Sequence, residues 1–280
     1  MQKIKMASEL YRRVKAAYDL HEKGGWYSHA DLFPLVSKEH LSAPLLKKYF
    51  FKRRSCVLAC IREEEDGELS VLLTVRSTTV SFKGQVCLPG GMEDESDGGS
   101  LIATALREAD EEINLKQDQV NVIGLIPPFM VVNTIKSQVF PCYAVMATLA
   151  GKRNELQLIP NEDEVSDYFW MPLRSFISSG PHHQQIKSGA LFGGDSRLSL
   201  DRFSYKSREG KLYQVMGLTA RLCIVTAMVA FNEPPHWPLA LQVCAPVERE
   251  EVHDERKGNL VPILRLPHNK YNLLPMKSKL

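Results

Sequence analysis

The chain has 280 residues, 44% of them hydrophobic, and its 35 basic and 33 acidic residues give a formal net charge of +2. This length allows one large or two small domains, with ample chain to bury a core. Because the net charge is close to zero, the protein as a whole has no strong electrostatic field that would require nucleic acid or a membrane surface as partner. The six cysteines form no CxxC pair and lie mainly in apolar segments, which favours free thiols in a reducing compartment over a disulfide framework.

The first 20 residues alternate basic and apolar side chains and lack the uninterrupted apolar core of a secretory signal. Five basic residues stand there against two acids, so a mitochondrial presequence is the alternative to the amphipathic surface helix that we expect. We predict a helical extension over residues 1–48, a principal domain over 49–235 and a C-terminal extension over 236–280.

Strand-like segments come next in the chain. Ser55–Ile61 and Leu69–Arg76 are apolar runs joined by the acidic turn EEEDGE at 63–68, which predicts a β-hairpin. Gln85–Leu88 supplies another short strand immediately before a pair of glycines.

Residues 101–113 are predicted to form a helix that carries Glu108, Glu111 and Glu112. At about 3.6 residues per turn these positions are related as i, i+3 and i+4, so their carboxylates share one face. Neighbouring anions repel one another unless cations neutralise them, and oxygen ligands suit Mg²⁺ or Mn²⁺, which also bridge to substrate phosphates. The helix therefore predicts a metal site for a phosphate-bearing substrate.

The alternative for this helix is an ordinary solvent-exposed face on which Arg107 and Glu111 form an i, i+4 ion pair. The segment Leu88–Gly91 weakens that alternative, because it carries the chain out of a strand and turns it just ahead of the helix. The side chains available to the core are those of Leu101, Ala105, Leu106 and Ile113.

Further strands are expected over Val120–Ile126 and Gln138–Ala147, and the prolines in the intervening segment 127–137 are expected to bar a continuous sheet. Glu164 opens another apolar segment. Leu218–Phe231 reads as a buried helix ended by the prolines that follow, and its apolar run is too short to cross a bilayer, which needs about 20 residues.

Two polar stretches have no clear periodicity. Residues 178–200 are expected to form a loop beside the site, with His182 and His183 as surface polar residues, since adjacent side chains rarely bind one metal ion. The charged run 249–257 is expected to be a solvated face or linker, with a protein contact as the weaker alternative.

The segment from Gly90 to Leu115 resembles the Nudix box, the signature of hydrolases that cut a nucleoside diphosphate linked to another moiety. Gly99 stands where the box has an acid eight residues before the arginine, in a loop two residues longer than the general pattern. Asn114 replaces a glycine where the helix ends and the backbone needs positive φ, which asparagine tolerates best after glycine. The resemblance implies an α/β (α+β) fold, the αβα sandwich with a central mixed sheet between helices. The matching residues are Arg107, Glu108, Glu111, Glu112 and Leu115.

A second resemblance, to the coenzyme A diphosphatase subfamily, extends over about residues 55–230. Ser81 occupies the position at which the subfamily signature has a basic residue, and Lys83 is expected to replace that basic residue. The segments that carry the resemblance are LLTVRS at 72–77, Gly84, CLPGG at 87–91, GGxxDxxD at 90–97, TALREA at 104–109 and NEDEV at 161–165.

The resemblance implies metal-dependent hydrolysis of coenzyme A or acyl-coenzyme A to 3′,5′-ADP and (acyl-)4′-phosphopantetheine, with water as nucleophile. Either Glu111 or Glu164 would accept the proton of that water, although Glu164 is as readily a loop acid. Arg107 is expected to orient Glu111. The remaining assignments are Glu108, Glu111 and Glu112 as ligands of Mg²⁺ or Mn²⁺, and Arg76, Lys83, Gly90 and Gly91 as substrate contacts, with solvent-facing roles open for Arg76 and Lys83.

Two alternatives remain open. The substrate could instead be NADH, ADP-ribose or another dinucleotide, because Ser81 departs from the subfamily signature. A nucleotide-binding module without catalysis is the second alternative, motivated by Gly99, Asn114 and the long loop.

Ser278, Lys279 and Leu280 match the tripeptide read by the peroxisomal import receptor. A chance tripeptide is the alternative, but the resemblance to coenzyme A diphosphatases makes a peroxisomal location and this receptor as partner the expectation.

Overall fold

The structure is a computed structural model that describes residues 8–23, 54–80, 82–133, 138–151, 156–188, 198–233, 235–237, 248–254 and 259–265. The described helices are α1 (Glu9–Lys23), α3 (Leu101–Ile113) and α4 (Gly217–Phe231). The described strands are β1 (Ser55–Glu63), β2 (Leu69–Arg76), β3 (Val86–Cys87), β4 (Gly90–Met92), β5 (Val120–Asn133), β6 (Gln138–Leu149), β7 (Val165–Pro172), β8 (His183–Ser188), β9 (Leu198–Lys206), β10 (Leu212–Met216), β11 (Glu248–Asp254) and β12 (Asn259–Arg265).

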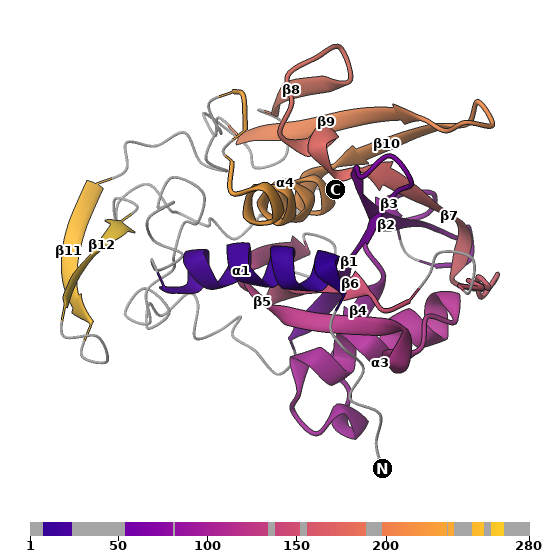
Figure 1. The fold of residues 1–280 in the computed structure, drawn as a ribbon, viewed down its shortest axis with the longest axis horizontal. Coiled ribbons are helices and arrows are strands. Elements are labelled where there is room, and N and C mark those ends of the chain that lie inside the picture. Colours follow the sequence, from indigo (N-terminus) through magenta and orange to yellow (C-terminus); the bar gives the residue numbers. More distant parts are fainter. Residues whose placement is uncertain are drawn as a thin grey trace, which may run out of the picture.

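A mixed seven-stranded sheet forms the centre of the fold (Figure 1). The strand order is β3-β2-β1-β6-β5, while β4 pairs with β1 and β7 pairs with β2. The pair β1–β6 is parallel and the other pairs are antiparallel. The predicted hairpin is confirmed, since β1 and β2 pair antiparallel around the acidic turn.

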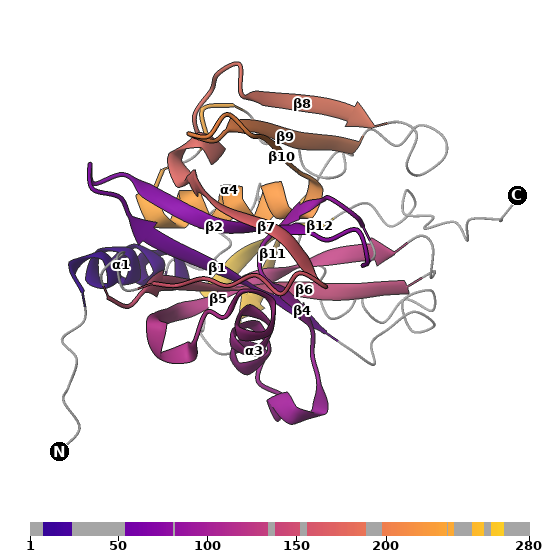
Figure 2. The ribbon, with the colours of Figure 1, turned by 90° about the vertical axis from the view of Figure 1, so that its right-hand side faces the viewer.

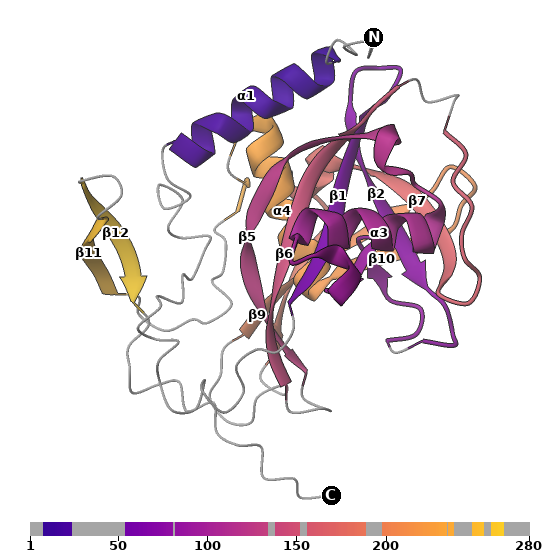
Figure 3. The ribbon, with the colours of Figure 1, turned by 90° about the horizontal axis from the view of Figure 1, so that it is seen from below.

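Helices cover both faces of this sheet. Alternate residues of β1 separate the two cores: Leu58 and Cys60 pack with α3, whereas Ala59 and Ile61 pack with α1 and α4. Figure 2 shows α3 on one side of the sheet and α4 on the other, and Figure 3 shows α1 beside α4. The predicted αβα sandwich is confirmed.

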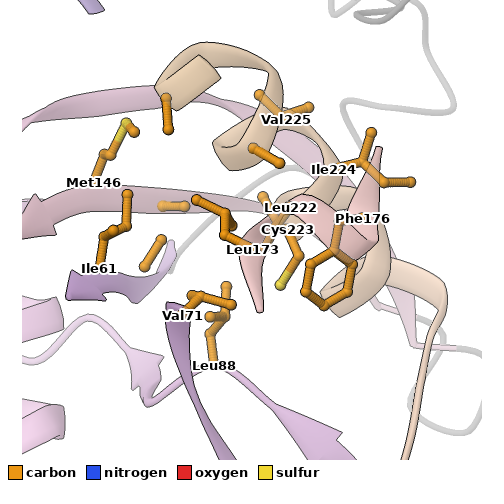
Figure 4. Packing of buried hydrophobic residues seen from close by; sticks show 14 of the residues in the cluster. Ile61, Val71, Leu88, Met146, Leu173, Phe176, Leu222, Cys223, Ile224 and Val225 are labelled. Carbon is orange, nitrogen blue, oxygen red and sulfur yellow. The ribbon is translucent and has the colours of Figure 1, made fainter. Parts of the chain in front are cut away.

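Apolar side chains dominate the core between α4 and the central sheet. Figure 4 shows Leu222 and Cys223 of α4 clustered with side chains of the sheet, among them Ile61 and Met146. The predicted buried helix is confirmed, but it ends at Asn232, whose positive φ of 52° closes the last turn before any proline.

Helix α1 packs one face into the same core. Tyr18 is 4% exposed and its hydroxyl donates to the Leu125 carbonyl at 2.9 Å. A β-carbon on Gly124 would lie 2.3 Å from the Tyr18 ring, so only glycine permits this approach. The expected amphipathic helix is therefore part of the sandwich rather than a purely superficial element.

The predicted loop over 178–200 is wrong for its described residues. β8 and β9 form a second sheet with β10, and Figure 2 shows it over the outer side of α4. The apolar alternation is hidden because the buried position in β8 is His183, whose side chain is 8% exposed and hydrogen-bonds Asp201 at 3.0 Å. The surface assignment of His183 is therefore also wrong. His182 is half-buried, with its Nε2 3.0 Å from the Ser175 carbonyl oxygen.

Two other predictions about strand boundaries are wrong. β5 continues through the prolines at 127 and 128, because a register shift between Ile126 and Phe129 takes them out of the ladder. Residues 249–254 of the charged run lie in β11, which pairs with β12, so the linker interpretation is wrong for them.

Five cysteines lie within the described residues and all are free thiols, four of them buried. Burial raises the pKa of the Cys60 thiol to about 12 and that of the Cys142 thiol to about 11. Cys244, Ser81 and the terminal tripeptide lie outside the described residues. Among the helices that the structure describes, none combines the length and apolarity needed to cross a membrane.

Candidate active site

Two adjacent glycines bring the chain close to both β1 and α3. Gly90 has φ of 150°, and a β-carbon there would lie 2.5 Å from the Cys56 carbonyl oxygen. A β-carbon on Gly91 would lie 2.5 Å from a carboxylate oxygen of Glu108. Position 90 therefore requires glycine, whereas at Gly91 the missing side chain allows the Glu108 carboxylate to rest against the backbone.

Capping residues define both ends of α3. Ser100 begins the helix by accepting a hydrogen bond from the Ala103 amide at 3.2 Å. Asn114 ends it with φ of 56°, and its amide donates to carbonyl oxygens of the last turn. The positive φ expected at this departure from the box is confirmed.

The three glutamates of α3 have different environments. Glu112 is 3% exposed and accepts a hydrogen bond from the Gly90 amide at 3.3 Å. The Glu108 side chain is 15% exposed, whereas that of Glu111 is 52% exposed. Glu108 and Glu112, one turn apart, thus lie between the helix and the glycine turn, and Glu111 lies toward solvent.

The pKa of Glu112 is raised to about 8, mainly by burial and also by the negative charges of Glu108 and Glu164, while the Gly90 amide and Arg76 oppose the shift. Burial also raises the pKa of Glu108, which Arg107 opposes. The two carboxylates therefore form a buried site in which negative charge is incompletely neutralised.

Arg107 connects the loop before α3 to two of the glutamates. Its guanidinium donates to Asp97 at 2.8 and 3.2 Å and to the Met92 carbonyl at 3.1 Å. It also pairs with Glu108 at 3.0 Å and Glu111 at 2.8 Å. Arg107 is thereby positioned to orient both carboxylates, as the sequence predicts for Glu111.

Asp97 is the residue that sequence reasoning did not single out. It is 7% exposed, and hydrogen bonds from Arg107 hold the pKa of its carboxyl group well below the usual range, assisted by the Asp94 amide and the Thr104 hydroxyl at 2.8 Å each. The loop is two residues longer than the usual box, so the acid that meets Arg107 lies two positions before Gly99. The second aspartate of the GGxxDxxD pattern was the available signal.

Residues distant in sequence complete the site. Arg76 influences the titration of Glu112 by its positive charge and hydrogen-bonds the Cys87 thiol. The Glu164 carboxylate raises the pKa of both Glu108 and Glu112. The backbone carbonyl of Glu164 accepts a hydrogen bond from the Ser77 amide at 2.8 Å. The structure therefore brings Arg76 and Glu164 to the buried glutamates, while Lys83 lies in the exposed turn between β2 and β3.

The acids of this site match the chemistry of a hard divalent cation. The buried Glu108 and Glu112 provide oxygen ligands and an excess of negative charge that a cation would neutralise. Within the described residues, no three His, Cys, Asp or Glu side chains are already arranged to hold a metal ion. Glu111 would have to turn from Arg107 to join the other two.

Comparison with known proteins identifies the domain. A model of the NUDIX domain matches residues 52–189. The peroxisomal coenzyme A diphosphatase NUDT7 of Mus musculus is 33% identical over 174 residues, which are 60% of this chain and 67% of that protein. The chain belongs to the Nudix family.

Two further relatives are similar over comparable lengths. The peroxisomal coenzyme A diphosphatase ndx-8 of Caenorhabditis elegans is 30% identical over 185 residues, 65% of this chain and 71% of that protein. Nudix hydrolase 15, mitochondrial, of Arabidopsis thaliana is 35% identical over 196 residues, 69% of this chain and 65% of that protein. This chain thus spans slightly less than two thirds of the plant relative, and the relatives differ in compartment.

Proposed function

We propose that this Nudix protein hydrolyses the diphosphate bond of coenzyme A and acyl-coenzyme A, releasing 3′,5′-ADP and (acyl-)4′-phosphopantetheine. The observation that carries the proposal is the buried Glu108–Glu112 pair against the glycine turn, whose pKa values are raised because burial disfavours the ionised forms that a bound cation would stabilise. The names of the mouse and nematode relatives support coenzyme A as substrate. The subfamily signature between β2 and β4 supports it independently.

The residues divide the chemistry among them. Glu108 and Glu112, joined by Glu111, would hold Mg²⁺ or Mn²⁺. The bound cation would neutralise the diphosphate and lower the pKa of a water molecule. Arg107, fixed by Asp97, positions the carboxylates of Glu108 and Glu111.

Glu164 is the residue we assign to accept the proton of the attacking water, with Glu111 as the alternative. Glu164 acts electrostatically on the buried pair but lies on a separate loop, so it remains available when all three helix glutamates bind metal. We assign Arg76 to contact a phosphate oxygen, which is supported by the effect of its charge on Glu112.

The direct test is release of 3′,5′-ADP from coenzyme A with Mg²⁺ or Mn²⁺. Glu108→Gln and Glu112→Gln should abolish it, whereas Asp110→Asn on the same helix should retain it, because Asp110 pairs with Lys116 away from the buried glutamates. Full turnover by the glutamine variants would refute the ligand assignment. Faster turnover of NADH or ADP-ribose than of coenzyme A would select the alternative substrate, and nucleotide binding without metal-dependent turnover would select the inactive module.

We also propose that the protein acts in peroxisomes and is carried there by the import receptor for Ser278–Leu280. The names of the mouse and nematode relatives support this location, while the name of the plant relative gives mitochondria. Deleting the tripeptide from a fluorescent fusion should move the signal from peroxisomes to the cytosol. An unchanged pattern would discard the address.

A further inference from the structure

One residue of the turn between β2 and β3 has an unusual backbone. Among the described non-glycine residues, Phe82, Asn114 and Asn232 have positive φ. The two asparagines close helices, where this conformation is common. Phe82 has φ of 60° with no such role, and an aromatic residue there costs roughly 1–2 kcal/mol.

Core packing does not offset that strain. Phe82 is 53% exposed, which makes it one of four large hydrophobic residues exposed among those described. Burying an aromatic side chain normally stabilises the folded state by a few kcal/mol. Because about half of the Phe82 side chain is exposed, much of this stabilisation is absent. A strained and exposed aromatic residue is therefore unfavourable for folding alone, which points to a role in binding.

The turn holds Phe82 in a defined place. The Gly84 amide donates to the Arg76 carbonyl at 2.9 Å, and the Arg76 amide donates to the Gln85 carbonyl at 3.0 Å. The Gln85 amide in turn donates to the Phe82 carbonyl at 3.2 Å. These bonds make the backbone at Phe82 an ordered part of the β2–β3 connection.

The base of this turn belongs to the candidate active site. Arg76 ends β2 and its charge lowers the pKa of Glu112. Ser77, the next residue, donates its amide to the Glu164 carbonyl at 2.8 Å and its hydroxyl to the Asp163 carbonyl at 2.7 Å. Because Gly84 and Gln85 hydrogen-bond the Arg76 backbone, Phe82 lies in a turn whose base contacts the candidate site.

Lys83 follows Phe82 in the chain and adds a positive charge to the turn. It is exposed and forms no ion pair with the part of the chain that the structure describes. An exposed aromatic ring followed by an unpaired cation matches a ligand with a flat base and a phosphate close together. It matches an acyl chain poorly, because an apolar chain gains nothing from an adjacent ammonium group.

We infer that Phe82 and Lys83 bind the nucleotide half of the substrate, with the Phe82 ring stacked on the purine and the Lys83 ammonium on a phosphate outside the scissile diphosphate. This inference rests on the proposed function and assigns the opposite, pantetheine half to another part of the site. It also accounts for positive φ and an exposed ring at the same position.

The phosphate contact is tested by comparing coenzyme A with dephospho-coenzyme A, which lacks the 3′-phosphate. The wild type should prefer coenzyme A about tenfold in kcat/KM, as expected for one charge-assisted contact. Lys83→Gln should bring the ratio close to one, and Lys116→Gln, a matched change on an exposed lysine of another region, should leave it unchanged. Equal ratios in wild type and Lys83→Gln would overturn this part of the inference.

The stacking contact is tested with Phe82→Ala, Phe82→Tyr and Phe82→Gly. Loss of the ring should raise KM and weaken 3′,5′-ADP binding about tenfold, as base–aromatic stacking predicts, and Phe82→Tyr should restore both. Phe82→Gly should also raise Tm, since it relieves the positive φ. A loss confined to long acyl-coenzyme A substrates, or unchanged 3′,5′-ADP binding, would overturn the inference.

Calorimetric binding of 3′,5′-ADP separates this inference from the proposed function. If the wild type does not hydrolyse coenzyme A, the proposed function fails, yet weaker 3′,5′-ADP binding by Phe82→Ala would still support the nucleotide contact. If the wild type hydrolyses coenzyme A and all Phe82 and Lys83 variants match it, only the contact is wrong.

Discussion

Two buried ionic clusters lie on opposite sides of the central sheet, and they differ in how far their charges are balanced. Beneath the second sheet, Asp201 meets Arg221 at 3.6 Å and His183 at 3.0 Å, so one acid has a full cation and a histidine as partners. At α3, Arg107 forms ion pairs with three acids, and Glu112 lies beside them. The three acids are Asp97, Glu108 and Glu111.

The first cluster is closed by aromatic packing. The His183 ring stacks on Phe203 and Trp237 at centroid distances of 4.7 and 3.8 Å. Its charges satisfy one another, so it holds β8 and β9 onto α4 without a ligand. The α3 cluster carries an excess of negative charge, and that excess, rather than burial itself, distinguishes a binding site from a structural contact.

The largest expected effect tests the unbalanced cluster. Glu112→Gln should lower kcat for diphosphate hydrolysis by at least about a thousandfold, equivalent to roughly 4 kcal/mol of transition-state stabilisation, because it removes a buried ligand. Steady-state release of 3′,5′-ADP measures it. Asp201→Asn, assayed well below its unfolding temperature, is the matched change in the balanced cluster and should retain turnover.

The free energy of unfolding should show the opposite order, with Asp201→Asn having the larger effect. Asp201→Asn leaves the buried Arg221 guanidinium without its acid and should lower the free energy of unfolding by about 3–5 kcal/mol in urea denaturation. Glu9→Gln on the exposed face of α1 should change it by less than about 0.5 kcal/mol. A small effect of Asp201→Asn would mean that the balanced cluster does not secure the second sheet.

The pH dependence of stability should report Glu112 in metal-free protein. Its folded pKa of about 8 lies above the value of an unfolded glutamate, so its contribution is present at low pH and is lost as pH rises through the folded pKa. Between about pH 5.5 and 7.5 this amounts to roughly 2–3 kcal/mol. Thermal unfolding of wild type and Glu112→Gln across this range measures it, and equal slopes would contradict the assignment.

The last prediction concerns neither cluster. Tyr18→Phe removes the hydroxyl that donates to the Leu125 carbonyl and should destabilise the fold by about 1 kcal/mol while leaving turnover intact. Loss of activity without loss of stability would indicate that α1 contributes to the site as well as to the core.

The same contrast explains what the sequence could predict. The bounds of α3 and the positive φ of Asn114 follow from local patterns of apolar residues and capping. β8 and β9 escaped prediction because a buried histidine and aspartate replace apolar residues there, and their partner Arg221 comes from a distant helix.

Within the site, the sequence could predict local geometry but not packing. The face shared by the helix glutamates follows from helical spacing, but their unequal burial depends on the approach of Gly90 and Gly91, which only the packed structure defines. The partner of Arg107 was missed because loop length, and not residue type, determines that Asp97 rather than position 99 reaches it.

The most direct test of the central claim is Mn²⁺ binding followed by electron paramagnetic resonance in wild type, Glu108→Gln, Glu112→Gln and Asp110→Asn. The unbalanced cluster predicts that the wild type and Asp110→Asn bind alike, while either glutamine variant weakens binding by more than about tenfold. Equal Mn²⁺ affinity in all four proteins would contradict the account.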